Sequence, residues 1–315
     1  MLLLGSENRE SPVFQSLSDA DTGNFNNPSL YIRGVRSKSG TLNALQTSII
    51  RFTGSRQHPD LCIDLIGVIH FAEKEYYEKL NQIFQEYDAV LYEMVIPAGM
   101  DYRQMAQSLK KESLRKQEPQ KEDFSFKFSP RKRPADPQIL LELFAKAQDW
   151  LGNRLKLVDQ TTWIDYTPQN MIHADIDSET FLKEIVEKGE IVDFFYQSIL
   201  DSMFSASNHG PSSILLFFAR DRTTALKRKV AEALLVSIDE DLKNTTIIGL
   251  RNRIAFRELT KTVEQGPKKI ALFYGSAHLS YFSLLLQEKF QFQSWKIRWL
   301  TAWSMPSVKE PIKPK

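Results

Sequence analysis

The sequence lacks most of the features that assign a chain to a class at once. Its single cysteine, Cys62, cannot form a disulfide within the chain, so the fold does not depend on an oxidising compartment. No stretch approaches the roughly 18 consecutive apolar residues that a membrane-spanning helix needs, and residues 1–5 lack the basic leader and the apolar core of a signal peptide. These absences predict a cytoplasmic protein without a transmembrane segment.

An excess of charge of one sign is also lacking. The 41 basic and 39 acidic residues leave a net charge of +2, which does not indicate a nucleic-acid partner. Apolar residues at 42% and charged residues at 25% are ordinary for a globular chain, and 315 residues can bury a sizeable core. No HExxH, Walker, GxGxxG or GxSxG pattern is present, so a function must be inferred from other residues.

Apolar runs with strand character lie toward the two ends of the chain. We expect strands at residues 48–52, 61–69, 89–95, 269–274 and 295–303. The first two flank a turn-like segment and predict a hairpin, whose second strand is apolar on both faces and therefore central. Helical spacing of apolar residues follows at 73–87 and 279–289, and the first of these helices predicts a parallel crossover between strands.

The middle of the chain has helical rather than strand character. The sequence therefore predicts an α/β (α+β) fold, with a mixed central sheet built from the N- and C-terminal parts and a helical insertion at about 101–265. We expect one domain at 41–305, a loose N-terminal arm at 1–40 and a C-terminal tail at 306–315. The basic stretch at 110–134 is typical of a solvated loop, although a lid or a surface for an anionic ligand stays open.

Two of the expected strands end in the same motif. Gly67 precedes His70 by three residues, and Gly275 precedes His278 by three residues. A glycine at this place fits a backbone that turns sharply from strand to helix and comes close to another backbone or to a ligand. Because open α/β sheets bind ligands at the carboxyl ends of their strands, we expect the two histidines to flank one cleft.

Glu93 places a carboxylate in the apolar strand at 89–95. An ionised carboxylate there is costly unless a cation or hydrogen-bond donors meet it, so it should have a partner. Two imidazoles and one carboxylate are the ligands of a catalytic metal site that leaves a position for water. Taken singly, each histidine could cap a helix and the glutamate could face an arginine, but together His70, Glu93 and His278 favour one shared site.

In this order and over this length, the two Gly-x-x-His motifs and Glu93 resemble the TraB/PrgY/GumN superfamily, which includes the TIKI proteases and has erythromycin-esterase and ChaN-like relatives. The similarity extends from about residue 50 to residue 303. Arg251 and Asn252 resemble the Arg-Asn pair that precedes the last motif of the family. Asp175, in the sequence His-Ala-Asp, resembles an element of the family's middle region.

The resemblance implies a metal-dependent hydrolase of peptide or ester bonds. His70, Glu93 and His278 would hold a divalent ion such as Mn, Co or Zn, whose water would attack an amide or ester carbonyl. Glu93 and Arg251 would be catalytic, with Arg251 stabilising the oxyanion. The alternative for Arg251 is an ion pair with Glu93 or with a surface acid.

The remaining residues of the resemblance would support the site: Gly67, Gly275, Asp175 and Asn252. Asp175 would either orient a ligand histidine or lie as an acid at a helix N-terminus. We expect a peptide or a small ester or amide as the substrate, and a homo-oligomer stays open. Because relatives include haem binders and proteins proposed to sequester a peptide, the alternative function is a non-catalytic peptide- or haem-binding protein that uses the same cleft.

Overall fold

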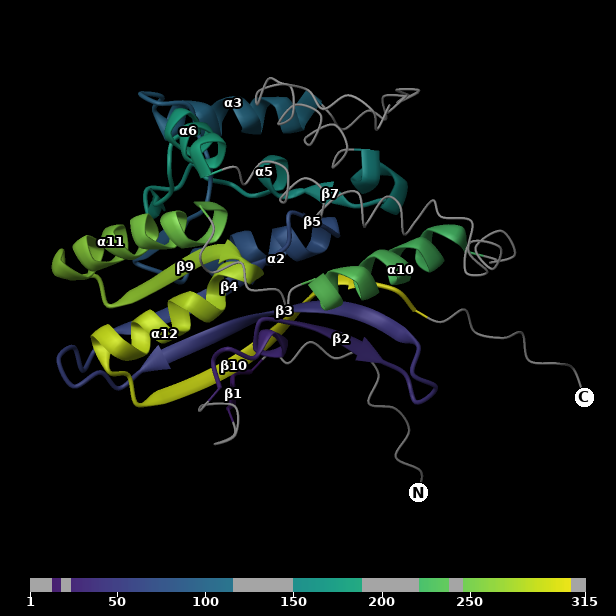
Figure 1. The fold of residues 1–315 in the computed structure, drawn as a ribbon, viewed down its shortest axis with the longest axis horizontal. Coiled ribbons are helices and arrows are strands. Elements are labelled where there is room, and N and C mark those ends of the chain that lie inside the picture. Colours follow the sequence, from purple (N-terminus) through teal and green to yellow (C-terminus); the bar gives the residue numbers. More distant parts are fainter. Residues whose placement is uncertain (1–12, 18–23, 116–149, 189–220, 238–245, 307–315) are drawn as a thin grey trace, which may run out of the picture.

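A mixed eight-stranded sheet forms the centre of the molecule (Figure 1). The computed structural model describes residues 13–17, 24–115, 150–188, 221–237 and 246–306. The strands run in the order β1-β10-β3-β4-β9-β6-β8, and β2 pairs with β3 beside this path. Their bounds are β1 (Gln15–Ser16), β2 (Ile32–Arg36), β3 (Leu42–Thr53), β4 (Cys62–Val68), β6 (Ala89–Tyr92), β8 (Met171–His173), β9 (Lys269–Gly275) and β10 (Ser294–Ser304). Two short strands, β5 (Phe71–Ala72) and β7 (Val158–Asp159), pair separately.

Helices connect and cover these strands. They are α2 (Lys74–Phe84), α3 (Tyr102–Arg115), α5 (Gln160–Trp163), α6 (Ser178–Lys188), α10 (Arg222–Ser237), α11 (Arg251–Glu264) and α12 (Leu279–Phe290), with short 3-10 or π turns at η1 (Pro28–Leu30), η4 (Thr246–Leu250) and η5 (Ser276–His278). The fold is of the predicted α/β class, with helices in the middle of the chain. No helix within the described ranges is long and apolar enough to cross a membrane.

The strands meet in a register that explains the position of the site. β3 and β4 form the predicted antiparallel hairpin, with Ile50 opposite Leu65. β9 lies between β4 and β6 and is parallel to both, so that Leu272 pairs with Leu65 on one side and with Leu91 on the other. The carboxyl ends of these three strands therefore lie at one edge of the sheet.

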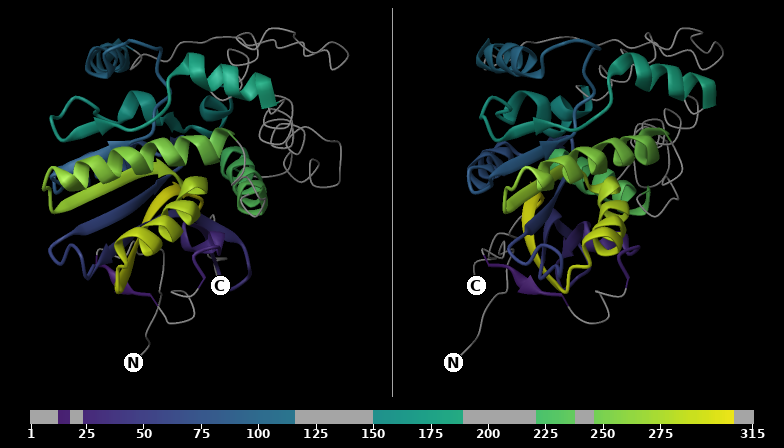
Figure 2. Two further views of the ribbon diagram at one scale, coloured as in Figure 1. Left: turned by 60° about the vertical axis from the view of Figure 1, so that its left-hand side comes forward. Right: turned by 90° about the vertical axis from the view of Figure 1, so that its left-hand side faces the viewer.

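Successive side chains of the sheet alternate between two cores. Leu65 belongs to the core under α11 and α12, whereas Ile66 belongs to the core under α2 and α10. Figures 1 and 2 show α11 and α12 side by side over one face of the sheet and α2 on the other. α3, α5 and α6 lie together at the top of the view in Figure 1, above β9 and away from β10. The result is a helix–sheet–helix arrangement with both faces of the central strands buried.

The structure differs from the expected organisation at two places. Residues 24–40, expected in a loose arm, include η1 and β2, and β2 pairs with β3 while Tyr31 is buried. The helical insertion contains β7 and β8, and β8 extends the sheet beyond β6. Of the basic stretch at 110–134, the structure describes residues 110–115, within α3, and the rest lies outside the described residues.

Replacing Leu272 with alanine tests the central place of β9. Leu272 is fully buried, so the cavity left behind should lower the free energy of unfolding by about 2–5 kcal/mol. Leu284, which is 40% exposed on α12, is the matched control, and L284A should cost less than about 1 kcal/mol. Urea unfolding followed by circular dichroism measures both. Equal losses in the two variants would contradict the described core.

Candidate functional site

Residues far apart in the sequence meet at the carboxyl ends of β6, β8 and β9. Glu93 follows β6, Asp175 follows β8, and His278 ends η5 after β9, while Arg251 begins α11. The register brings these ends together, because Tyr92 pairs with residues of both β8 and β9. We name Glu93, Asp175, Arg251 and His278 the charge cluster. Each of its members is less than one tenth exposed.

Arg251 joins the two carboxylates of the charge cluster. Its Nη2 donates to Glu93 Oε1 at 2.6 Å and to Asp175 Oδ2 at 2.6 Å, and its Nε donates to Asp175 Oδ1 at 2.9 Å. Burial alone would lower the pKa of the guanidinium, but the two carboxylates outweigh it and raise that pKa. Of the two predictions for Arg251, the ion pair with Glu93 is therefore confirmed. Asp175 is the second partner of Arg251. The acid at the N-terminus of α6 is instead Asp177, which accepts from the backbone N–H of Thr180.

Glu93 is held as an ionised carboxylate. Burial alone would raise the pKa of its carboxyl group, but the charges of Arg251 and His278 outweigh it and hold that pKa well below its ordinary value. Oε2 accepts the backbone N–H of Gly275 at 2.6 Å. The sequence expectation that this carboxylate requires a partner is confirmed.

Gly275 leaves the space that the carboxylate occupies. A Cβ atom on Gly275 would lie 3.2 Å from Glu93 Oε2, which is closer than an ordinary van der Waals contact. Its backbone is not left-handed, with φ of −49°. The glycine therefore serves the close approach of the carboxylate rather than an unusual turn.

Gly67 has a similar but separate role. A Cβ atom there would lie 2.9 Å from Ser276 Oγ and 3.1 Å from Leu279 Cδ2. Because Gly67 has no side chain, β4 can pack against η5 and the start of α12, and this packing fixes the backbone that carries His278. The close approach predicted for the two motif glycines is present at both, on different neighbours.

His278 has both ring nitrogens directed at polar atoms. Nδ1 lies 2.5 Å from Asn252 Oδ1, and Nε2 lies 3.5 Å from Glu93 Oε1. If Nδ1–H donates to Asn252, a neutral ring presents the lone pair of Nε2 to a carboxylate, which is repulsive. A second proton on the ring, or a cation between the two atoms, removes that repulsion. The Nδ2 atom of Asn252 is buried and has no hydrogen-bond partner among the described residues.

His70 lies at the rim of the site rather than in the charge cluster. Its side chain is exposed, and its Nδ1 lies 3.0 Å from Gln160 Oε1. Its charge contributes to lowering the pKa of Glu93, less than the charges of Arg251 and His278 do, which places it within electrostatic range of that carboxylate. The sequence did not single out Gln160, because one polar residue after a short apolar run carries no periodic signal.

The predicted metal ligands are only partly brought together. Two ligands of one tetrahedral ion, each about 2.1 Å from it, lie about 3.4 Å apart, so Glu93 and His278 have the spacing of such a pair. No group of three His, Cys, Asp or Glu side chains suited to an ion occurs in the described part of the chain, and Arg251 already binds the same glutamate oxygen. The three-ligand set with His70 does not fit this arrangement, and the ion stays a prediction.

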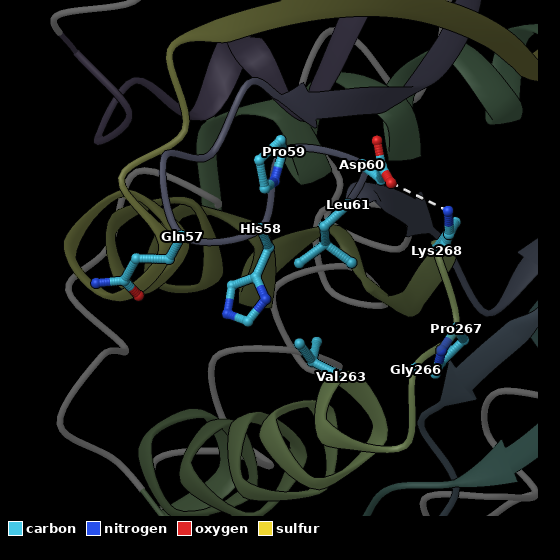
Figure 3. A pocket seen from close by; sticks show the side chains of 9 residues that line it. All are labelled: Gln57, His58, Pro59, Asp60, Leu61, Val263, Gly266, Pro267 and Lys268. Carbon is cyan, nitrogen blue, oxygen red and sulfur yellow. Dashed lines mark hydrogen bonds and ion pairs between the residues drawn. The ribbon is translucent and has the colours of Figure 1, made fainter.

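A shallow depression of about 260 Å³ lies at the other end of the sheet (Figure 3). It lies where β4 and β9 begin, and Asp60 and Lys268 form an ion pair of 3.0 Å at its edge. His58 is its only histidine, and its ring packs against Phe290. Neither His70 nor His278 lines this depression, so it is not the cleft that the sequence predicts between the two histidines.

No family model, curated protein or solved structure matches this chain.

The ionised state of Glu93 makes stability depend on pH. Its pKa is lower in the folded than in the unfolded chain, so its contribution is complete above the unfolded value of about 4.3 and is lost as the pH falls through the folded value. Urea unfolding between pH 7 and pH 3 measures the difference in free energy of unfolding between wild type and E93Q. This difference should be constant above about pH 5.5 and should shrink below about pH 4.5.

The control for this measurement is E86Q, since Glu86 forms a surface ion pair with Lys269 that contributes little. Wild type and E86Q should differ by less than about 1 kcal/mol at every pH. An advantage over E93Q that grows as the pH falls would contradict the described charge state of Glu93.

Replacing Gly275 with alanine should loosen the hydrogen bond to Glu93 Oε2 and raise the pKa of that carboxyl group toward its ordinary value. An NMR titration of the Glu93 carboxyl carbon measures this shift. Gly34 is a tight position beside Leu42, so G34A is the matched control and should leave the Glu93 titration unchanged. The same shift in both variants would show a general loosening of the fold instead.

Proposed function

We propose that the protein is a hydrolase of peptide or ester bonds whose reaction centre is formed by His70, Glu93 and His278. The observation that carries this proposal is the buried carboxylate of Glu93. Its Oε1 accepts from Arg251 at 2.6 Å and lies 3.5 Å from the Nε2 atom of His278. A buried, strongly perturbed carboxylate at the carboxyl ends of parallel strands is typical of a functional site.

Each of these residues has a role that its surroundings support. In this proposal the Nε2 atom of His278, 3.5 Å from Glu93 Oε1, carries the proton that is donated to a leaving group. His70 is exposed, and no described residue hydrogen-bonds to its Nε2, so this atom can accept a proton from an attacking water. Arg251 donates to both carboxylates, and in this proposal it holds Glu93 in place rather than binding the oxyanion.

The resemblance to the TraB/PrgY/GumN superfamily supports the same reaction class. On this proposal the chain is a relative that keeps both Gly-x-x-His motifs, the strand glutamate and the Arg251 and Asn252 pair. The family also implies a divalent ion that would activate water. Because the described residues gather only Glu93 and His278 at ligand spacing, no step of the proposed reaction depends on that ion.

One observation favours the second candidate, a protein that binds a peptide or haem-like ligand without turnover. Of the three residues of the reaction centre, only His70 is exposed, so a ligand that contacts the surface meets one histidine and not the charge cluster. Retention of intact ligand by the wild type, with no products formed, would support this candidate.

Hydrolysis of a panel of peptides and small esters tests the first candidate. H70N, H278N and E93Q should each lower kcat/KM by about 100-fold or more, because each removes a proton-transfer group or the charge that supports it. H58N is the matched control and should keep the wild-type rate, since His58 lies at the opposite end of the sheet. Circular dichroism checks that each variant is folded.

Wild-type rates in folded H70N, H278N and E93Q would exclude this reaction centre. Metal analysis and added chelator extend the same assay. A rate that falls with chelator and returns with Mn, Co or Zn would show that an ion takes part, and would require Glu93 to exchange Arg251 for that ion.

A further inference from the structure

Gln160 contacts His70 through both its backbone and its side chain. The backbone N–H of Gln160 donates to the carbonyl oxygen of His70 at 2.9 Å, and its Oε1 lies 3.0 Å from His70 Nδ1. The two residues continue the ladder of β5 and β7, in which Phe71 pairs with Asp159. Gln160 is 3% exposed although His70 is open to solvent. The imidazole is therefore held from its buried side.

A third residue hydrogen-bonds to the amide of Gln160. The Nε2 atom of Gln160 donates to the hydroxyl oxygen of Tyr166 at 3.1 Å, and its Oε1 faces the imidazole of His70. An amide oxygen can only accept, and the partner nitrogen of His70 must then carry the hydrogen. In a neutral ring this leaves Nε2, on the exposed side, as the nitrogen with the free lone pair.

The other motif histidine has the same kind of partner. Nδ1 of His278 faces Asn252 Oδ1 as Nδ1 of His70 faces Gln160 Oε1. Asn252 comes from α11 and Gln160 from α5, so two unrelated elements supply equivalent amide oxygens. In both rings an amide oxygen therefore contacts Nδ1, although His278 is buried and His70 is exposed.

We infer that Gln160 is a positioning residue that holds His70 in the Nδ1–H tautomer and presents its Nε2 to the solvent side as a hydrogen-bond acceptor. Tyr166 supports it by accepting a hydrogen bond from the amide nitrogen. The consequence for turnover rests on the proposed function, because Nε2 is the atom that would accept a proton from water. The tautomer itself can be measured without any activity.

The test is long-range ¹H–¹⁵N NMR of histidine-labelled protein at a pH where the ring of His70 is neutral. In the wild type the Nδ1 signal should be that of a protonated nitrogen and the Nε2 signal that of an unprotonated one. Q160L removes the acceptor and should shift His70 toward the Nε2–H tautomer. Q160E keeps an acceptor and should preserve the wild-type pattern. Q46L, which replaces another buried glutamine, is the control and should leave His70 unchanged.

Two results would overturn the inference: a wild-type His70 in the Nε2–H form, or an Nδ1–H form that persists in folded Q160L. The hydrolysis assay adds a separate arm, in which Q160L should lower kcat about tenfold or more and Q160E should recover part of the loss. A wild type that hydrolyses nothing would refute the proposed function, and the NMR result would still decide the role of Gln160.

Discussion

The ion pairs of Arg251 with Glu93 and Asp175 are the constraint on which the site depends. Removing three charges from water costs several kcal/mol per ion unless each has a closely placed partner. The ends of β6 and β8 and the start of α11 must therefore meet to within hydrogen-bond distance. The absence of a side chain at Gly275 also favours this arrangement, since a Cβ atom there would lie only 3.2 Å from Glu93 Oε2.

Local signals were sufficient for much of the fold. Apolar runs predicted the hairpin of β3 and β4, the strands β9 and β10, and the helices α2 and α12, because each is long enough to show its period. β8 was not predicted, since its three residues are too few to show alternation. β2 was placed in the loose arm because the Ser-, Asn- and Gly-rich residues before it have no sustained period.

The candidate site could be predicted only in part, because its partners are distant in sequence. The cost of a buried carboxylate indicated that Glu93 has a partner, yet only the fold shows that this partner is Arg251, 158 residues away. The two motifs also have unequal surroundings. His278 leads directly from β9 into α12 and is buried, whereas His70 is followed by β5 before α2 begins and stays exposed. Similar spacing thus did not produce similar burial.

The position of β9 has a consequence for how the chain folds. A strand from the last quarter of the sequence lies between β4 and β6, which come from the first third. During synthesis these two strands have no central neighbour until residues 269–275 leave the ribosome, and their apolar edges are open in the meantime. Contacts of such large sequence separation slow folding, so we expect a slow folder that is prone to aggregate before β9 is inserted.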